Sequence, residues 1–377
     1  MPKSKADSKG LKDNIAKGSK GKSDGFTNKE GSNRRQAAPL GNVVLLAQGT
    51  FGCVYHPGIT CNHEPLDTKY ITKIHASNEK TTQNEIAISK KVQTIPNYEL
   101  YFSPILENCE VNLAKVNREE VEKCNFIKDE IDRKDEIDRK DDIGIDRKDD
   151  IGKDQKPITY MSTKIRFIEG NSLLEYVQEK KETNKPATMY SLALSLYNKL
   201  CKSVKKLAEK EIVHFDLREN NMIVSKKGEP IIIDFGISID FEKKNTKKNF
   251  LKNAFYAYTT QYKPWCIEVV LICFIVHHKL SQLTSEKIME IFDEVMKHND
   301  FANKPWLKEH FPKYREHFKK HISTKSPQEL MEYLLSTYKR WDLYSVTILF
   351  IQMLEKIGQE PKDPELIKEI MEKLGFI

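Results

Sequence analysis

Three polar side chains with oxygen ligands stand close together within residues 212–238. Two short apolar runs flank a turn at residues 227–228, as in a hairpin, and each brings one carboxylate, Asp216 or Asp234, while Asn221 lies between Asp216 and the turn. One carboxylate can orient or deprotonate the hydroxyl of an acceptor. The amide and the other carboxylate offer the hard oxygen ligands that Mg²⁺ prefers when it carries a nucleotide's phosphates. The spacing therefore indicates a phosphoryl-transfer site.

A glycine-bearing loop at residues 47–52 lies between two apolar runs, residues 43–46 and 53–55, that predict strands. Gly49 and Gly52 would let backbone N–H groups approach phosphate oxygens closely. The same G-x-x-G pattern is common in ordinary hairpin turns, so alone it does not establish a phosphate site.

A strand predicted at residues 70–74 contains Lys73, and a helix predicted at residues 78–92 contains Glu85. From below the glycine loop, the Lys73 cation could reach the α and β phosphates, and Glu85 could pair with it. Lysines in strands and glutamates in helices are usually solvated surface charges. The pair therefore supports a nucleotide site only together with the other motifs.

Composition places the chain among ordinary globular proteins. Its 377 residues, 39% of them hydrophobic, allow roughly two domains with a sizeable core. Seven scattered cysteines without a close C-x-x-C pair predict neither disulfides nor a zinc site and favour a reducing compartment. The most apolar run, residues 267–276, is shorter than the roughly 20 residues of a membrane-spanning helix. We therefore expect a soluble, intracellular protein with no membrane partner.

The net charge of +7 is concentrated at the start of the chain. Residues 1–40 contain ten Lys or Arg against four acidic residues and almost no large apolar side chains, which predicts a disordered basic tail. Such a tail can act as a solubilising arm, or it can contact nucleic acid, an acidic protein or a nuclear import receptor. Any contact with nucleic acid is expected through this tail alone.

Residues 126–156 form a low-complexity run of K-D-E-I-D-R and K-D-D-I-G units. The repeat length does not match the helical period, Lys and Arg neutralise nearly every carboxylate, and lone isoleucines cannot build a core. The run predicts a solvated insertion. A metal-binding acidic loop is the less favoured alternative.

Order is expected to resume with a strand at residues 158–167 and a short helix at residues 173–180, capped by Ser172. Leucine and valine recur at spacings of three and four along residues 188–210, the pattern of a long helix buried in a core. This helix leads directly into the segment that carries Asp216.

The motifs in this order resemble the signature set of eukaryotic-type protein kinases: G-T-F-G-C-V, Lys73, Glu85, R-F-I-E-G, H-F-D-L-R-E-N-N and I-I-D-F-G. The resemblance implies an α+β, two-lobed protein kinase-like fold. A small β-rich N-lobe would span residues 41–168, and a mainly helical C-lobe would span residues 169–377.

The resemblance also assigns roles to residues. Asp216 would orient or deprotonate the acceptor hydroxyl, Arg218 would stand near the γ-phosphate, and Lys73 would bind phosphates while paired with Glu85. Asn221 and Asp234 would hold Mg²⁺, for which Mn²⁺ could substitute. The ATP-binding residues would be Gly49, Thr50, Phe51, Gly52, Val54, Lys73, Ile165, Arg166 and Phe167, with Ile165 at the gatekeeper position.

Four departures from the family pattern stand out. Ala47 replaces the first loop glycine, which should stiffen the loop. Phe215 replaces the arginine that meets a phosphorylated activation loop in many kinases, so we expect constitutive activity or another form of control. Arg218 replaces a lysine and Glu219 a proline. A cation at position 218 resembles the serine/threonine group, although arginine geometry could reduce the rate.

The pattern is looser in the C-terminal part. Residues 237–260 would be the activation segment, and Glu268 could stand in for the glutamate of the family's A-P-E ending. Residues 269–340 are predicted to be an atypical insertion of helices. The helix that follows resembles the family's central C-lobe helix, where Asp342 would brace the catalytic loop. Alternatively, Asp342 only caps an amphipathic helix.

Shorter strings, Y-I-T-K-I, I-P-N-Y, Y-F-S-P-I and P-W-C-I-E-V, are similar to serine/threonine kinases encoded by large cytoplasmic DNA viruses. That similarity implies a location in the host cytoplasm or the virion. The whole pattern predicts an ATP-dependent serine/threonine kinase acting on protein substrates. The alternatives are an atypical or small-molecule kinase of related fold and a catalytically silent kinase-like scaffold. No motif indicates an oligomeric state.

Overall fold

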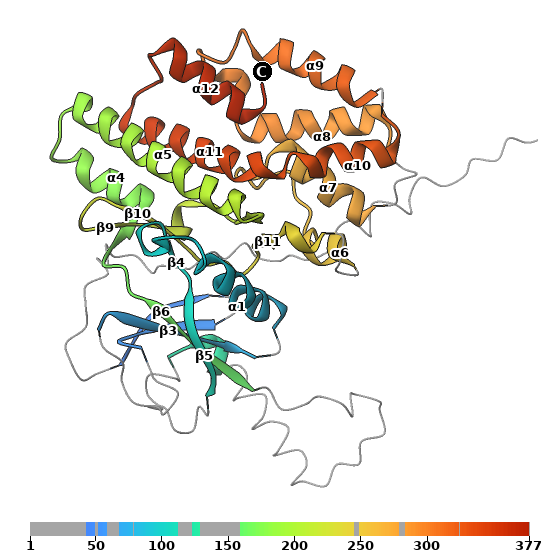
Figure 1. Cartoon of the computed structure of the whole chain (residues 1–377). Coiled ribbons are helices and arrows are strands. Elements are labelled where there is room, and N and C mark those ends of the chain that lie inside the picture. Colours follow the sequence, from blue (N-terminus) through green and yellow to red (C-terminus); the bar gives the residue numbers. More distant parts are fainter. Residues whose placement is uncertain are drawn as a thin grey trace, which may run out of the picture.

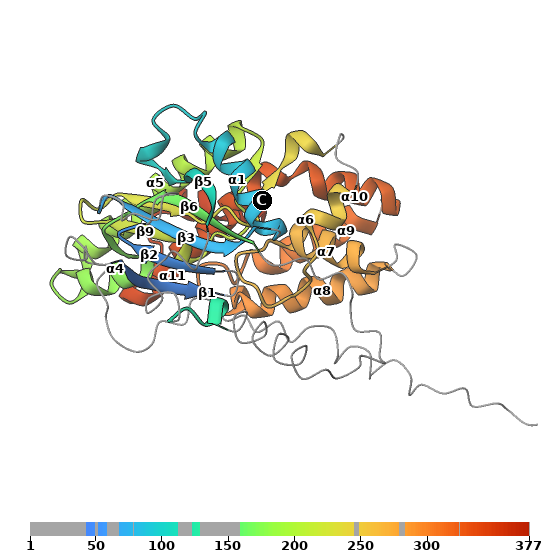
Figure 2. The same cartoon turned by 90° about the horizontal axis from the view of Figure 1, so that it is seen from below.

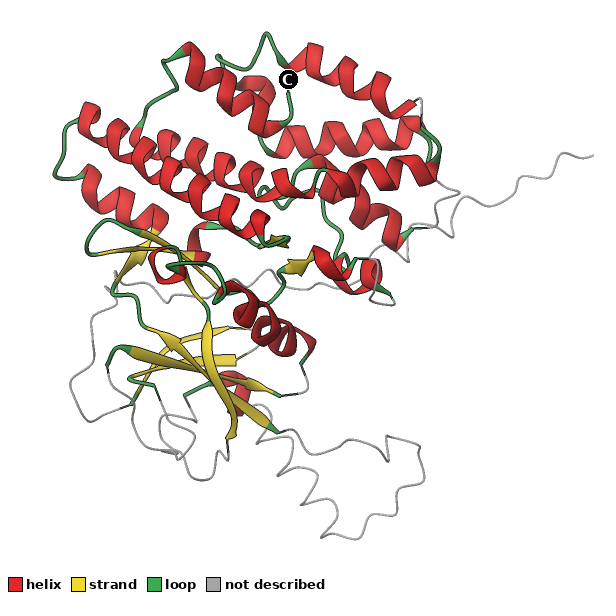
Figure 3. Cartoon of the chain, viewed as in Figure 1, coloured by secondary structure: helices red, strands yellow, loops and turns green. Residues whose placement is uncertain are grey.

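The structure is a computed structural model of the chain, and it describes residues 43–49, 52–58, 68–77, 79–111, 123–128, 159–244, 249–278, 283–323 and 325–376. A smaller lobe rich in strands lies against a larger lobe made mainly of helices (Figures 1 and 3). The two-lobed α+β prediction is therefore confirmed. The basic tail at residues 1–40 and the loop residues Thr50 and Phe51 lie outside the described residues.

The N-lobe is built on one antiparallel sheet with the strand order β1-β2-β3-β6-β5. Its strands are β1 (Val44–Gly49), β2 (Gly52–His56), β3 (Tyr70–Ala76), β5 (Ile105–Val111) and β6 (Tyr160–Arg166). Helix α1 (Lys80–Val92) packs on this sheet through Ile86, which meets Ile105 and Ile165 in a small apolar cluster. The predicted strands and the helix near Glu85 are confirmed to within a few residues. Strand β5 was not predicted.

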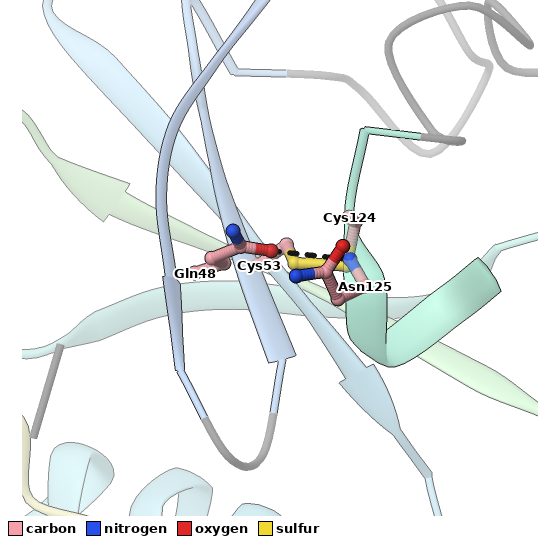
Figure 4. Close-up of a disulfide and its surroundings, with 4 residues drawn as sticks. All are labelled: Gln48, Cys53, Cys124 and Asn125. Carbon is pink, nitrogen blue, oxygen red and sulfur yellow. Dashed lines mark hydrogen bonds between the residues drawn. A yellow bond between two sulfur atoms is a disulfide. The ribbon is translucent and has the colours of Figure 1, made fainter. Parts of the chain in front are cut away.

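A disulfide joins Cys53 to Cys124, and the prediction that the chain forms none is wrong. Figure 4 shows it beside the glycine hairpin, where the backbone N–H of Asn125 also donates to Gln48 Oε1 at 3.1 Å. Cys109 is disulfide-bonded as well. The bonded cysteines are 71 residues apart, so only the folded sheet brings them together. The inference of a reducing compartment loses its support.

The first residues of the expected insertion belong to the folded N-lobe. Residues 125–128 are helical, and Ile127 is fully buried in a cluster with Cys53, Cys124 and Tyr160. The prediction that the isoleucines of residues 126–156 contribute to no core is therefore wrong for Ile127. The rest of that run lies outside the described part of the chain.

The C-lobe is organised around two long helices, α5 (Pro186–Glu209) and α11 (Trp341–Ile357). They pack on each other, and the ring of Tyr197 stacks on that of Phe350 at 4.3 Å. Helix α4 (Leu173–Lys181) precedes them and begins with a capping box formed by Ser172 and Glu175. The predicted buried helix at residues 188–210 and the predicted cap are thus confirmed.

Short strands flank the segments that contain the predicted site residues Asp216, Asn221 and Asp234. A four-stranded sheet has the order β4-β10-β9-β7, and a two-stranded ribbon pairs β11 with β8. These strands are β4 (Phe102–Ser103), β7 (Gly170–Ser172), β8 (Ile212–Val213), β9 (Met222–Ser225), β10 (Pro230–Ile233) and β11 (Ile239–Asp240). Strands β9 and β10 form the hairpin between Asn221 and Asp234, so the two apolar runs around the predicted site are strands, as expected.

Helices fill the remainder of the C-lobe: α6 (Phe250–Ala254), α7 (Ile267–His277), α8 (Ser285–His298), α9 (Phe311–Ser323), α10 (Pro327–Ser336) and α12 (Pro364–Leu374). Single 3-10 turns occur at Tyr98–Leu100, Glu219–Asn221, Phe241–Lys243, Phe301–Asn303 and Tyr338–Arg340. Helices were predicted in this region, and the apolar side chains of α8 are buried. Figure 2 shows α7, α8, α9 and α10 gathered on the side of the molecule away from α4. In the described residues, no helix is long and apolar enough to cross a membrane.

Candidate active site

A cleft between the lobes brings the predicted nucleotide-binding residues together. Val54, Lys73, Ile165, Arg166 and Phe167 all line it. Apolar side chains above and below give it the character of a slot for a flat ring: Leu46, Ala47, Ile71, Ile168, Ile223 and Ile233. The predicted hinge thus lies at the cleft, and Ala47 belongs to its lining.

The two loop glycines pair with each other at the end of the β1-β2 hairpin. A Cβ atom at Gly52 would lie 2.3 Å from the Ile74 carbonyl oxygen, so the close packing of β2 on β3 requires glycine there. This packing requirement is independent of phosphate binding. The role of Gly49 and Gly52 in holding phosphates stays a prediction.

Lys73 forms the predicted ion pair with Glu85. Its Nζ lies 2.9 Å from Glu85 Oε2 and 3.4 Å from Asp234 Oδ1, so one cation bridges the helix and the metal-ligand candidate. Burial alone would lower the pKa of Lys73, but the charges of Asp234 and Glu85 outweigh it and hold that pKa above its ordinary value. The lysine is therefore cationic at neutral pH.

Helix α1 is tied to the segment after Asp234, which keeps Glu85 within reach of Lys73. Asn84 Nδ2 donates to the carbonyls of Gly236 at 3.1 Å and Ser238 at 2.8 Å. About two turns further along α1, Lys91 Nζ lies 2.7 Å from Asp240 Oδ1 and 2.8 Å from a second carboxylate, that of Glu242.

Asp342 braces the catalytic loop, as predicted. Its two carboxylate oxygens accept the backbone N–H groups of His214 at 2.7 Å and Phe215 at 3.1 Å. Phe215 has a φ of 71°, a left-handed conformation that a bulky residue adopts only when its surroundings hold it. The reading of Asp342 as a simple helix cap is thereby excluded, because both of its oxygens bind the loop.

The carboxylate of Asp216 is held by two neighbours. Asn221 Nδ2 donates to Asp216 Oδ2 at 2.9 Å and to the Asp216 carbonyl at 2.8 Å, and the phenol of Tyr262 donates to Oδ1. Burial raises the pKa of Asp216, although these donors and Arg218 partly oppose the shift. Asp216 thus has the position and the environment of a proton acceptor.

Asp234 and Phe235 lie at the junction of the two lobes. The Asp234 carboxylate accepts the Gly236 N–H at 3.3 Å, and Lys73 and this N–H lower its pKa despite its burial. Phe235 is buried between the rings of Phe102 and His214. With the phenylalanine packed inward, the Asp234 side chain lines the cleft.

The oxygen atoms present fit a magnesium ion bound together with phosphates. Both N–H bonds of the Asn221 amide are engaged, and no hydrogen bond to its Oδ1, or to Asp234 Oδ2, occurs in the described residues. The same part of the chain contains no cluster of three or more His, Cys, Asp or Glu that could hold a metal by itself. Mg²⁺ commonly binds one or two side-chain oxygens plus phosphates and water.

Arg218 contributes an unpaired donor to the site. Its Nε atom is buried and has no hydrogen-bond partner within the described residues. A buried N–H of a cation without a partner is costly unless an anion completes it. The arrangement is therefore suited to a negatively charged group next to Asp216.

An aromatic cluster occupies the place of the missing arginine. Phe215 packs against Trp265 at 5.0 Å, Phe255 at 5.7 Å and Trp341 at 6.5 Å between ring centroids. Trp265 Nε1 also donates to the Phe215 carbonyl at 2.9 Å. At Phe215, the segment after Asp234 is thereby joined to the catalytic loop by aromatic packing and a hydrogen bond rather than by an ion pair.

Two site contacts were missed by sequence reasoning. Tyr262 carries no motif that marks it as a neighbour of Asp216. Glu268 was recognised, but its partner was not: Arg340 Nη2 lies 3.0 Å from Glu268 Oε1, 72 residues further along the chain. Glu268 lies on α7 and Arg340 in the turn before α11, so only the fold brings this pair together.

Comparison with known proteins agrees with this geometry. The family model for the protein kinase domain matches residues 156–340. "Probable serine/threonine-protein kinase glkA" of Dictyostelium discoideum is 27% identical over 125 residues, 29% of this chain and 26% of that protein. "Mitogen-activated protein kinase kinase 3" of Arabidopsis thaliana is 31% identical over 83 residues, 22% of this chain and 15% of that protein. The matched stretches thus span about a quarter or less of these relatives.

The family match covers the catalytic loop, the β9-β10 hairpin and the segment up to the central helix. Lys73 and Glu85 lie outside it, yet the fold brings them to Asp234. Residues 156–340 therefore match the protein kinase domain, and the two-lobed fold of the described residues is that of eukaryotic-type protein kinases.

Proposed function

We propose that this chain is an active protein kinase that transfers the γ-phosphoryl group of ATP to serine and threonine hydroxyls of proteins. The observation that carries the proposal is the Lys73 bridge, in which one partly buried cation contacts both Glu85 and Asp234. A scaffold has no physical need for this bridge beside an intact pair of Asp216 and Asn221. The name of the Dictyostelium discoideum relative supports the choice of serine and threonine.

The residues would divide the reaction as follows. The apolar cleft holds the adenine, and Lys73 binds the phosphates. The oxygen of the acceptor hydroxyl bonds to the γ-phosphorus, and Asp216 accepts the proton that this hydroxyl loses. At the same time the bond from that phosphorus to the ADP oxygen breaks. Arg218 Nε donates to the transferred group. Mg²⁺ held by Asn221 and Asp234 would neutralise phosphate charge, and Mn²⁺ could substitute for it.

Labelling with radioactive ATP tests the proposal. Wild-type protein is incubated with mixed basic, acidic and neutral proteins, and the labelled residues are mapped. The variant Asp216→Asn should lose about two to four orders of magnitude in rate, because only the acceptor's base is removed, and it should still bind Mg²⁺-ATP in a thermal-shift assay. Equal turnover by the variant contradicts the role of Asp216.

The alternatives give different results in the same experiment. A silent scaffold shows no Mg²⁺-dependent nucleotide binding or no transfer, whereas a small-molecule kinase consumes ATP without labelling any protein. Labelling of tyrosine would support the protein kinase activity but contradict the proposed specificity for serine and threonine.

The cellular location and the partners of this protein are likewise proposals. Protein substrates are implied by the family. The similarity to kinases of large cytoplasmic DNA viruses, with a host-cytoplasm or virion location, stays a prediction, as does contact with nucleic acid through residues 1–40. Fractionation of a cell that produces the protein would test the intracellular location.

A further inference from the structure

The phenol of Tyr262 lies directly on the carboxylate of Asp216. It donates to Oδ1, while Asn221 donates to Oδ2 at 2.9 Å, so each oxygen of the catalytic carboxylate has its own donor. Tyr262 reaches this position from the segment before α7, 46 residues beyond Asp216 in the chain. Burial and the neighbouring carboxylate raise the pKa of Tyr262, so the phenol keeps its proton and acts as a donor.

The backbone around Tyr262 is firmly held. Its carbonyl accepts the Trp265 N–H at 3.0 Å, and its ring packs edge-on against the Trp265 ring at 5.2 Å. Trp265 is bound in turn to the Phe215 carbonyl, one residue before Asp216. From the central helix, Ser345 Oγ donates to the Pro264 carbonyl at 2.6 Å. These contacts fix the phenol relative to the carboxylate.

A carboxylate oxygen can accept two hydrogen bonds, so the phenol leaves Oδ1 a second lone pair. With one donor on each oxygen, the carboxylate cannot rotate freely about its Cβ–Cγ bond. Resting on the proposed function, we propose that Tyr262 is a positioning residue for phosphoryl transfer, which fixes Asp216 so that a free lone pair meets the acceptor hydroxyl.

The test is the variant Tyr262→Phe, which keeps the ring packed on Trp265 and removes only the donor. A hydrogen bond to a charged group contributes about 1.5 kcal/mol or more, so we expect kcat for a protein substrate to fall roughly tenfold. The KM for ATP should stay within about twofold, because Tyr262 is not part of the cleft lining. Tyr258→Phe is the matched control, since Tyr258 lies on the same segment and its ring packs on Phe274 at 5.4 Å.

A second background separates positioning from a general structural role. In Asp216→Asn protein, Tyr262→Phe should cause little further loss, because the group that it positions is already changed. A full additional tenfold loss there means that Tyr262 acts only through the fold and overturns the proposal. So does an unchanged kcat in Tyr262→Phe, or an increased one, which would mean that the phenol competes with the acceptor. If wild-type protein labels no substrate, the proposed function fails and this inference falls with it.

Discussion

Asp342 offers the sharpest test of how the catalytic loop is held. It is 5% exposed, and its two oxygens accept the N–H groups of His214 and Phe215. Asp342→Asn keeps the size of the side chain but replaces one acceptor oxygen with an NH₂ group. One buried N–H then loses its partner and faces another donor.

The expected loss can be estimated from these contacts. A buried donor left unpaired costs about 1–3 kcal/mol, and the bond to a charged acceptor is lost as well. Burial raises the pKa of Asp342, which means that burying its charge is itself unfavourable. Removing the charge therefore offsets part of the lost stability. We therefore expect the free energy of unfolding to fall by about 2 kcal/mol. Because Phe215 at φ 71° precedes Asp216, we also expect kcat to fall at least tenfold.

Urea unfolding followed by tryptophan fluorescence measures the stability, and protein phosphorylation measures kcat. Asp363→Asn is the matched control, because Asp363 is an exposed helix cap that accepts one N–H, and asparagine caps equally well. ATP binding should be unchanged in both variants. A loss below about 0.5 kcal/mol with normal kcat in Asp342→Asn would refute the bracing role.

Two further predictions concern the N-lobe. Replacing residues 129–156 by a short Gly-Ser linker should leave the unfolding equilibrium constant and kcat within about twofold of the wild-type values. Ile127→Ala, in contrast, should lower the free energy of unfolding by about 2–4 kcal/mol, because it leaves a cavity in the core. An unchanged free energy of unfolding in Ile127→Ala would contradict the burial of this side chain. Buried His75 has a pKa lowered to about 3 by burial and by the charge of Lys73. The pKa of His75 is lower in the folded state than in the unfolded state, so only the unfolded state binds a proton between about pH 6.5 and pH 3. The contribution of neutral His75 to the free energy of unfolding is therefore fully present above about pH 6.5. It declines by up to about 1.4 kcal/mol per pH unit as the pH falls from there toward 3. Urea midpoints between pH 7.5 and 5 should fall more steeply for wild type than for His75→Gln, and parallel curves would contradict the assignment.

Local patterns made much of the fold predictable. The core stripe of α5, the strands around Lys73 and the segment from Asp216 to Asp234 depend on neighbouring residues, and short-range periodicity reports them. The Lys73–Glu85 pair could be predicted because it joins two adjacent elements.

The family resemblance predicted one long-range contact, that of Asp342 with the catalytic loop, but others could not be predicted. The Cys53–Cys124 bond, the contact of Tyr262 with Asp216 and the Glu268–Arg340 pair join residues that no local pattern connects. The burial of Ile127 was missed because a repetitive charged run hides a single apolar residue that the N-lobe sheet recruits.

The aromatic cluster around Phe215 has a consequence for the conditions under which the segment after Asp234 stays docked on the catalytic loop. An arginine that holds a phosphorylated segment depends on charge, which salt screens and a phosphatase removes. Packing of Phe215 on Phe255, Trp265 and Trp341 is stabilised by the exclusion of water from apolar surface. Neither salt nor a phosphatase removes this stabilisation. We therefore expect the docking of this segment to persist at high ionic strength and after phosphatase treatment, and to weaken on cooling, as apolar contacts do.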